Sequence, residues 1–411
     1  MANKLTVEQI MQRHKLAQNR KEDFRSLYED AMEYALPQRN LYSGDYETNN
    51  GGRKKMTRVF DSTAINSTQR FANRLQSGIF PPQRKWCRLE PGSDIPQERR
   101  AEAQTALDLY NEKMFAVLKQ SNFDIAMGEF LLDLSVGTAV MLVQPGDAIS
   151  PINFIPVPQY LVAFEEGANG QVDNVYRRMR LKGEALNQQW PDITIPQDLQ
   201  VMINDKPTEE IDLVEATVYD YDRGDYCYHV IHPKSNSELV YRRVKTSPWV
   251  VSRYMKVAGE IYGRGPVLTA LPDIKTLNKT LELLLKNASL AITGVYTAAD
   301  DGVLNPATVR IVPGAIIPVA RNGGSQGDAL KPLPRAGDFN VSQIIINDLR
   351  ANIKRTLLDE SLPPDNMSAR SATEVVERMK ELAQNLGSAF GRLINETMIP
   401  IVSKMLEVMD Q

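Results

Sequence analysis

The residues best suited to bind a metal lie in one short stretch, Cys227-Tyr-His229-Val-Ile-His232. Thiolate and imidazole are preferred zinc ligands, and a zinc site needs three or four ligands that converge on one point. The stretch reads as a β-strand, in which alternate side chains point to opposite faces, so Cys227 and His229 share a face while His232 points away. No Cys-x-x-Cys and no second histidine pair accompanies them. The pattern favours a strand that carries two histidines, and we expect no metal.

Glycine-rich segments that could cradle a phosphate are weak candidates. The chain has no Gly-x-x-x-x-Gly-Lys-[Ser/Thr] motif, which excludes a P-loop motor. Gly263-Arg-Gly265 is followed by Pro266, which lacks a backbone N–H that a phosphate cradle would use. The run from Gly323 to Gly327 has no lysine and no helix after it. We therefore expect no cofactor.

No nucleophile lies in a pattern typical of catalysis. Cys87 has no base marked within its reach, and the third histidine, His14, lies in a charged helix. Adjacent acid pairs such as Glu165-Glu166 and Asp300-Asp301 diverge on a regular strand or helix. The sequence thus indicates a protein that is not an enzyme, since an enzyme would need a convergent polar site.

Composition is that of an ordinary globular chain. The 411 residues suggest roughly two to four domains, and 42% are hydrophobic and 24% charged. A formal net charge of −3 is not typical of a tight nucleic-acid binder, so any DNA contact must be local, weak or geometric. Two cysteines far apart fit a reducing compartment. With no apolar run after the N-terminus and no long apolar stretch, we expect neither a signal peptide nor a membrane span.

Basic residues gather at three places. Arg53-Lys54-Lys55 with Arg58 could contact phosphate or a partner, although a solvated loop is the favoured interpretation. Two later segments carry basic residues at helical spacing, namely Lys275, Lys279 and Lys286 on the first, and Arg350, Lys354 and Arg355 on the second. On composition alone such residues are usually polar helix faces.

Helices are predicted in the first third of the chain and strands in the middle. Helical periodicity covers residues 5–35, 61–79, 98–119 and 122–135. Trp86 to Leu89 is expected to be a short strand. From Thr138 to about Tyr254 the apolar period changes to two, which predicts a mostly β block with one helix candidate near Gly183 to Gln189.

Two long helices are predicted after the Gly263–Pro266 corner. The first spans residues 267–292 and would be about 39 Å long, and the second spans residues 339–360. Their apolar stripes are too long for the core of one subunit, which suggests packing between subunits. The same corner could also be a plain turn before an ordinary core helix.

Between and after these helices lie two irregular segments. Residues 294–337 form a Gly/Pro-rich insertion with β candidates at 309–312 and 315–319. Residues 361–370 form a loop with Pro363-Pro364, followed by a helix that opens with the capping-box pattern Ser371-Ala-Thr-Glu374.

This order of parts resembles the portal (head-to-tail connector) proteins of short-tailed bacteriophages. Sequence echoes of that family span most of the chain, and they include Tyr34-Ala-Leu-Pro-Gln-Arg39, Phe71-Ala-Asn-Arg-Leu-Gln-Ser-Gly-Ile-Phe-Pro-Pro82, Leu271-Pro-Asp-Ile-Lys-Thr-Leu-Asn278, Ser371-Ala-Thr-Glu-Val-Val-Glu-Arg378 and Gly391-Arg-Leu-Ile-Asn-Glu-Thr-Met-Ile-Pro400.

The resemblance implies an α+β, ring-forming portal-like fold. It has an α/β wing, two long stem helices, a small β-containing clip and a C-terminal crown-side helix. The implied parts are a wing (1–265), stem helix 1 (266–293), a clip (294–337), stem helix 2 (338–360), a tunnel loop (361–371) and a wing or crown-side helix (372–411). Relatives usually continue into a fuller crown, so we expect this chain to be C-terminally incomplete.

The function that the resemblance implies is a conduit for DNA packaging and ejection. It is a homo-oligomeric ring, typically of about twelve subunits, at one capsid vertex of the virion, assembled in the host cytoplasm. Implied partners are double-stranded DNA without sequence specificity, the terminase large subunit, a tail adaptor, and capsid and scaffolding proteins. The runner-up is another ring protein of the virion neck, such as an adaptor.

The resemblance also implies three groups of site residues. Lys275, Lys279, Lys286, Arg350 and Lys354 are candidates for the channel face of the stem. Gly323, Gly324, Gln326 and Asp328 are candidates for docking through the clip. In the tunnel loop, Asp365, Asn366, Met367 and Arg370 are candidates for the narrowest ring, where Arg370 would offer a transient phosphate contact and Asp365 would oppose adhesion.

Overall fold

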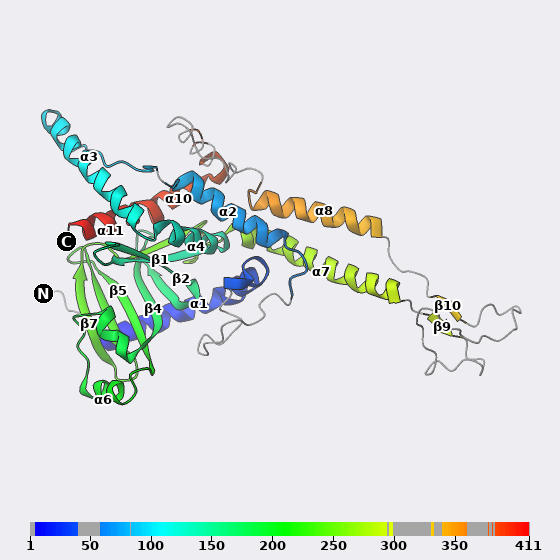
Figure 1. Cartoon of the computed structure of the whole chain (residues 1–411), viewed down its shortest axis with the longest axis horizontal. Helices are drawn as coiled ribbons and strands as arrows, with labels where there is room; N and C mark the ends of the chain where they lie inside the picture. The colour runs from blue at the N-terminus through cyan, green and yellow to red at the C-terminus, as the bar shows by residue number, and fades with distance from the viewer. Residues whose placement is uncertain are drawn as a thin grey trace, which may run out of the picture.

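A broad body carries two long helices that project from it side by side (Figure 1). The computed structural model describes residues 5–39, 58–82, 84–293, 296–298, 330–332, 339–359, 377, 380 and 383–410. The projecting helices are α7 (Pro266–Thr293) and α8 (Phe339–Thr356). Beyond their far ends lie two short antiparallel strands, β9 (Tyr296–Ala298) and β10 (Leu330–Pro332).

Four helices precede the sheets. They are α1 (Val7–Ala35), α2 (Thr63–Ile79), α3 (Gln97–Gln120) and α4 (Phe123–Val136), with a short 3₁₀ turn, η1, at Pro37–Arg39. Helix α1 starts with a capping box, in which Thr6 and Gln9 satisfy each other's backbone N–H groups. These helices confirm the periodicity read from the sequence.

The strand predicted at Trp86 to Leu89 is wrong. This segment is extended but belongs to none of the three sheets. It runs along α3 instead, where the Leu89 N–H donates to the Asn111 Oδ1 at 3.0 Å and Arg88 pairs with Asp108. Side chains of a helix therefore satisfy the polar groups that a neighbouring strand would have satisfied.

A three-stranded antiparallel sheet, in the order β2-β1-β8, lies at the centre of the body. Its strands are β1 (Thr138–Pro145), β2 (Ile152–Val157) and β8 (Trp249–Arg253). One face packs on α2, α4 and the C-terminal helices. Most residues of β1 are buried, because elements also cover the opposite face of the sheet. The other face packs on α1 and on the base of α7.

A five-stranded antiparallel meander forms the second sheet. Its strands in order are β3 (Val162–Glu166), β4 (Val172–Lys182), β5 (Glu210–Asp220), β6 (Asp225–His232) and β7 (Ser237–Val244). Helix α1 covers one face of the sheet. The other face is covered by η3 (Gly183–Ala185), α5 (Leu186–Gln189) and α6 (Gln197–Asp205). A further 3₁₀ turn, η2 (Gln159–Leu161), lies directly before β3.

The C-terminal region is a segmented helix on the three-stranded sheet. Helix α10 (Ser388–Leu393) continues through the π-helical turn η4 (Ile394–Met398) into α11 (Ile399–Met409). The π turn ends at Met398, two residues before Pro400, which has no N–H to donate to the carbonyl of Glu396 four residues earlier. A local shift of the hydrogen-bond pattern accommodates that loss.

Candidate functional site at the base of the paired helices

The corner before α7 is a place of close backbone approach. A Cβ on Gly265 would lie 2.1 Å from the Ser135 carbonyl oxygen, and one on Gly263 would lie 2.3 Å from the Gly137 carbonyl oxygen. The Gly263 N–H donates to the Thr138 Oγ1 at 2.8 Å and the Gly265 N–H donates to the Val136 carbonyl at 2.8 Å. Neither N–H is left for a phosphate, so these glycines fit the start of α7 against the α4–β1 junction.

The base of the helix pair is buried in the body. Val267, Ala270, Ile274 and Leu277 of α7 share an apolar core with Tyr28 of α1. Ile346 and Ile353 of α8, and Leu357 just after this helix, are buried and join the same core. The corner and this core together fix where the two long helices leave the body.

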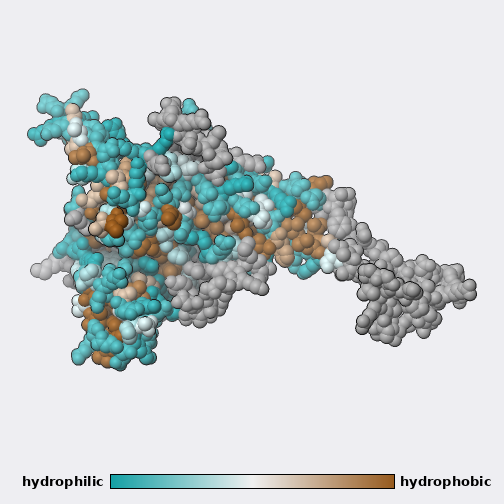
Figure 2. Space-filling model, in the orientation of Figure 1, coloured by the Kyte–Doolittle hydropathy of each residue, from teal (hydrophilic) through white to brown (hydrophobic). Residues whose placement is uncertain are grey.

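The outer part of the pair is different, because apolar side chains there are exposed. Leu283 and Leu285 of α7 are 53% and 54% exposed, and Ile344 and Ile345 of α8 are 61% and 46% exposed. Figure 2 shows hydrophobic residues along the projecting part of the molecule. Within the described residues, nothing else packs along this part, so each helix has only the other as a neighbour.

A three-helix clasp holds the base of the pair. Asn278 of α7 is buried, and its Oδ1 accepts from the N–H groups of Phe60 and Asp61 at 2.7 and 3.1 Å. The Asp61 Oδ2 in turn accepts from Arg350 of α8 at 2.7 and 3.0 Å. Burial alone would raise the pKa of Asp61, but hydrogen bonds from Thr63 and Arg350 outweigh it and hold this pKa below its usual value.

The basic residues predicted to face a channel are mostly paired within the chain. Lys275 pairs with Asp30 of α1 at 2.5 Å. Lys279 and Lys286 lie on the same face of α7 and both pair with Glu282, at 3.0 and 2.6 Å. Arg350 is part of the clasp, and Lys354 is half-buried. The structure brings Lys275, Lys279 and Lys286 onto one helix face, which is consistent with their spacing.

The other predicted site residues lie outside the described part of the chain. This holds for Gly323, Gly324, Gln326 and Asp328, and also for Asp365, Asn366, Met367 and Arg370. The β candidates at 309–312 and 315–319 lie outside it as well. Strands β9 and β10 are the described elements of the insertion.

The residues considered as metal ligands have other partners. The Nδ1 atom of His229 lies 2.6 Å from a Glu238 carboxylate oxygen, and the Nδ1 atom of His232 lies 2.7 Å from the Ser235 hydroxyl. Cys227 lies 3.8 Å from the Tyr241 hydroxyl. Among the residues that the structure describes, no three His, Cys, Asp or Glu side chains are placed to hold a metal ion.

A hollow of about 500 Å³ lies on the five-stranded sheet near the start of α1. His229 and Cys227 line it, together with Tyr219 and Arg243. Arg243 already pairs with Asp220 and Asp225. His229 is buried against Glu238, so this hollow contains no nucleophile with an adjacent free base among the groups described here.

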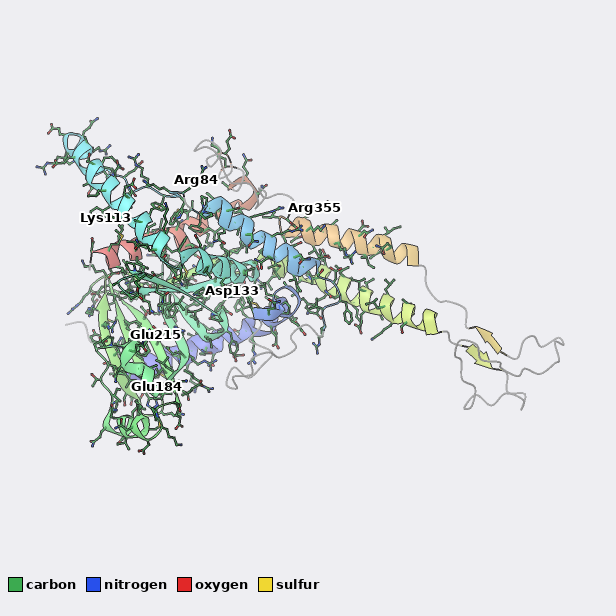
Figure 3. The ribbon with its side chains drawn as sticks, viewed as in Figure 1. Arg84, Lys113, Asp133, Glu184, Glu215 and Arg355 are labelled. Carbon is green, nitrogen blue, oxygen red and sulfur yellow. The ribbon has the colours of Figure 1, made fainter. Side chains whose placement is uncertain are left out.

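Sequence reasoning missed the buried charge networks of the body. The Arg253 side chain is fully buried and pairs with Glu166 at 2.8 Å and with Glu396 at 2.6 Å. Asp133 is also buried and accepts two hydrogen bonds from Arg39, both at 2.9 Å. Burial raises the pKa of Asp133 despite this partner. Asp133 and Glu215 both lie inside the body (Figure 3).

Two buried basic side chains lie where α1 covers the five-stranded sheet. Burial, and then the nearby Arg178, lowers the pKa of His14 to about 4. The same two causes lower the pKa of Lys21 to about 7. Lys21 donates to the Tyr160 carbonyl and lies 5.3 Å from the centre of the Tyr160 ring.

In the described part of the chain, no helix is long and apolar enough to cross a membrane.

Comparison with known proteins identifies the class to which this scaffold belongs. Residues 7–411 match the family described as bacteriophage head to tail connecting protein, and the chain is a member of that family. This match confirms the resemblance seen in the sequence motifs.

Three curated relatives are similar along nearly the whole chain. It is 22% identical to the probable portal protein of Bordetella phage BPP-1, over 98% of this chain and 74% of the relative. It is 20% identical to the portal proteins of Enterobacteria phage T3 and Escherichia phage T7, in each case over 92% of this chain and 70% of the relative.

Among solved structures, similarity is weaker. A chain from the virion of a native gene transfer agent particle matches with a TM-score of 0.37 and 11% identity, over 84% of this chain and 83% of that chain. A chain from the neck of an empty gene transfer agent particle matches with a TM-score of 0.33 and 13% identity, over 82% and 79%.

Proposed function

We propose that this chain is a portal protein of a short-tailed phage, one subunit of a ring at a single capsid vertex. The observation that carries the proposal is the projecting α7–α8 pair, with a buried base and exposed apolar residues further out. Membership of the head-to-tail connecting family and the names of the curated relatives support it. The fold proposed is that of a portal, with a wing, a two-helix stem and a clip.

A ring accounts for the exposed apolar residues of the stem. Covering Leu285 and Ile345 with a neighbouring copy would stabilise the assembly by about 25 cal/mol for each Å² of apolar surface buried. In a closed ring each subunit uses two different faces, one toward each neighbour. We propose a ring of about twelve subunits, because portals of this type usually have that number.

The charge of the stem suits a channel through which DNA slides. Each phosphate that a protein neutralises adds to a salt-dependent affinity, so persistent contacts would hold DNA in place. Lys279 and Lys286 share Glu282, and Lys275 is paired with Asp30, so the basic face proposed for the channel is largely compensated within each subunit. Arg350 and Lys354 would complete this face.

The other parts take the roles implied by the family. Residues 1–265 and 372–411 would form the wing and crown side, and residues 294–337 would form the clip that docks the terminase large subunit and then the tail adaptor. Gly323, Gly324, Gln326 and Asp328 would lie at that docking surface. Residues 361–371 would form the tunnel loop, with Asp365, Asn366, Met367 and Arg370 toward the axis.

The proposed protein is not an enzyme. A separate terminase ATPase would move double-stranded DNA through the ring during packaging, and DNA would leave by the same route during ejection. Capsid and scaffolding proteins would contact the wing as the ring is built in the host cytoplasm and incorporated into the virion.

Imaging of the purified protein by negative-stain electron microscopy tests the proposal. We expect rings with a central hole, and a mass by light scattering that is several times the chain mass of 46.2 kDa. A protein that stays monomeric in buffers of low and high salt, and that forms no ring with its capsid and scaffolding proteins, would contradict it.

A further inference from the structure

Helix α8 ends at a residue in an unusual backbone conformation. Leu358 has a φ of 55°, and Asn236 is the other non-glycine residue with positive φ in the described chain. This left-handed region places a Cβ close to the following carbonyl oxygen, so leucine adopts it at an energetic cost that glycine does not incur. Leu358 is therefore held in this conformation by its surroundings.

Two backbone hydrogen bonds define the end of the helix. The Leu358 N–H donates to the Arg355 carbonyl at 3.1 Å, and the Asp359 N–H donates to the Lys354 carbonyl at 2.9 Å. These are the two bonds of a Schellman motif, in which the left-handed position is usually glycine. The geometry is regular for a helix end, and leucine is the unusual choice.

The Asp359 side chain ties this end to α2. Its carboxylate is 2% exposed and accepts from the Ser67 hydroxyl at 3.0 Å. Arg70 lies 3.3 Å from it and Arg74 lies 3.7 Å from it. Three consecutive turns of α2 thus contact one carboxylate, and Figure 3 shows Arg355 at the end of α8 that lies near α2.

A second contact holds α8 to α2 independently. Arg350 pairs with Asp61, and it lies six residues, or about 9 Å along the helix, before Thr356, the last residue of α8. Because Asp61 precedes Ser67 just as Arg350 precedes Asp359, α2 and α8 run in the same direction. Loss of the Asp359 contact would leave the Asp61 contact in place, so the change would be confined to the last turns of α8.

We propose that Asp359 and Leu358 form a two-position latch at the end of α8. With Asp359 bound to Ser67, Arg70 and Arg74, Leu358 is held left-handed and the helix stops. With Asp359 released, Leu358 relaxes to a right-handed conformation and the last turn opens. The side chain of Arg70 is 55% exposed, so dissolved anions compete with Asp359 for it and favour release. The latch does not depend on the proposed function.

Hydrogen–deuterium exchange of the full-length protein, read on a peptide that contains residues 354–359, tests the latch. Asp359→Asn should speed exchange at least ten-fold, because the charge that binds Arg70 and Arg74 is lost. Leu358→Gly should slow it about five-fold, because glycine is left-handed without strain. Asp348→Asn, at an exposed aspartate of the same helix, is the matched control and should change nothing.

The double variant Leu358→Gly/Asp359→Asn distinguishes a latch from simple local stability. If strain at Leu358 drives the opening, glycine should return exchange of the Asp359→Asn protein to within about three-fold of wild type. Exchange in wild type should also rise with NaCl, and that rise should be absent in Asp359→Asn. Faster exchange in Leu358→Gly alone, or unchanged exchange in Asp359→Asn, would overturn the proposal.

Discussion

The Arg350 guanidinium of α8 donates two hydrogen bonds to one carboxylate oxygen of Asp61, through Nε at 3.0 Å and through a terminal nitrogen at 2.7 Å. The other Asp61 oxygen accepts from the Thr63 N–H at 2.8 Å. Both oxygens of this buried carboxylate are thus used, and the pair joins the start of α2 to α8.

Asp61→Ala should destabilise the protein by about 2–4 kcal/mol, because it removes the partner of Arg350 and an acceptor at the start of α2. Urea unfolding of the purified protein measures the change. Glu184→Ala, at an exposed carboxylate of the body, should lie within about 0.5 kcal/mol of wild type. Equal stability of both variants would show that the clasp contributes nothing.

Leu285→Asp and Ile345→Asp should block ring assembly without unfolding the subunit. Both side chains are exposed in the single chain, so an aspartate there remains solvated until a neighbour covers it. Light scattering reports assembly and circular dichroism reports folding. The matched controls are Asn287→Asp and Asn347→Asp, which add the same charge at exposed polar positions of α7 and α8. Normal rings from both test variants would contradict packing between subunits through these residues.

Glu396→Gln should cost about 3–5 kcal/mol, because it leaves the fully buried Arg253 with a single carboxylate, Glu166, and removes a charged acceptor. The loss should appear as a lower midpoint in thermal or urea unfolding. Glu184→Gln makes the same chemical change at the surface and should be neutral. A neutral Glu396→Gln would mean that Glu166 alone compensates the arginine.

Lys21 should make the protein more stable as pH rises from about 7 to 10.5. Its pKa is lowered from 10.5 to about 7 by burial, so between these values the unfolded chain binds a proton that the folded chain does not. Lys21→Met should remove this part of the pH dependence and stabilise the protein at pH 7 by about 1–3 kcal/mol. Denaturant titrations at several pH values measure both effects. An unchanged pH profile in Lys21→Met would refute the prediction.

Gly265→Ala should prevent folding or lower stability by more than about 3 kcal/mol, since the new Cβ would overlap the Ser135 carbonyl oxygen. Gly391→Ala is the control, because its Cβ would meet no atom within 4 Å and alanine favours the helix. Soluble expression and thermal unfolding of the two variants should differ clearly. A stable Gly265→Ala protein would show that the corner can open.

Most of the helices were predictable because their apolar spacing is regular and their packing is local. The limits of α7 agree with the pattern from residue 267 to 292. Helix α6 was missed because its apolar stripe is short, and only Leu199 and Ile203 of it are buried. The extended segment from Trp86 to Leu89 has residues typical of a strand, but the Leu89 N–H bonds to the Asn111 side chain of α3 and not to a second strand. The residue pattern of the segment does not indicate which of these partners it has.

The site was less predictable than the fold. Spacing placed Lys275, Lys279 and Lys286 on one face, but it did not reveal the carboxylates that pair with them. Lys279 and Lys286 share one such partner, Glu282. Arg253 ends a strand, and nothing in the sequence indicates that this charged side chain is buried. Its partner Glu396 is 143 residues away in the chain. Such pairs depend on how distant elements meet, which one sequence does not determine.

Pro272 lies inside α7, within the buried base of the helix. It has no N–H to donate to the carbonyl four residues earlier, so α7 bends more easily here than elsewhere. The residues that follow, Ile274, Leu277 and Asn278, are held in the body, however, so the part of α7 that can tilt runs from Asn278 to Thr293. This part is about 22 Å long, and a tilt of about 5° at its base would move the far end by about 2 Å. The projecting part of α7 is therefore a lever arm, whose fulcrum is close to the body and whose free end moves furthest.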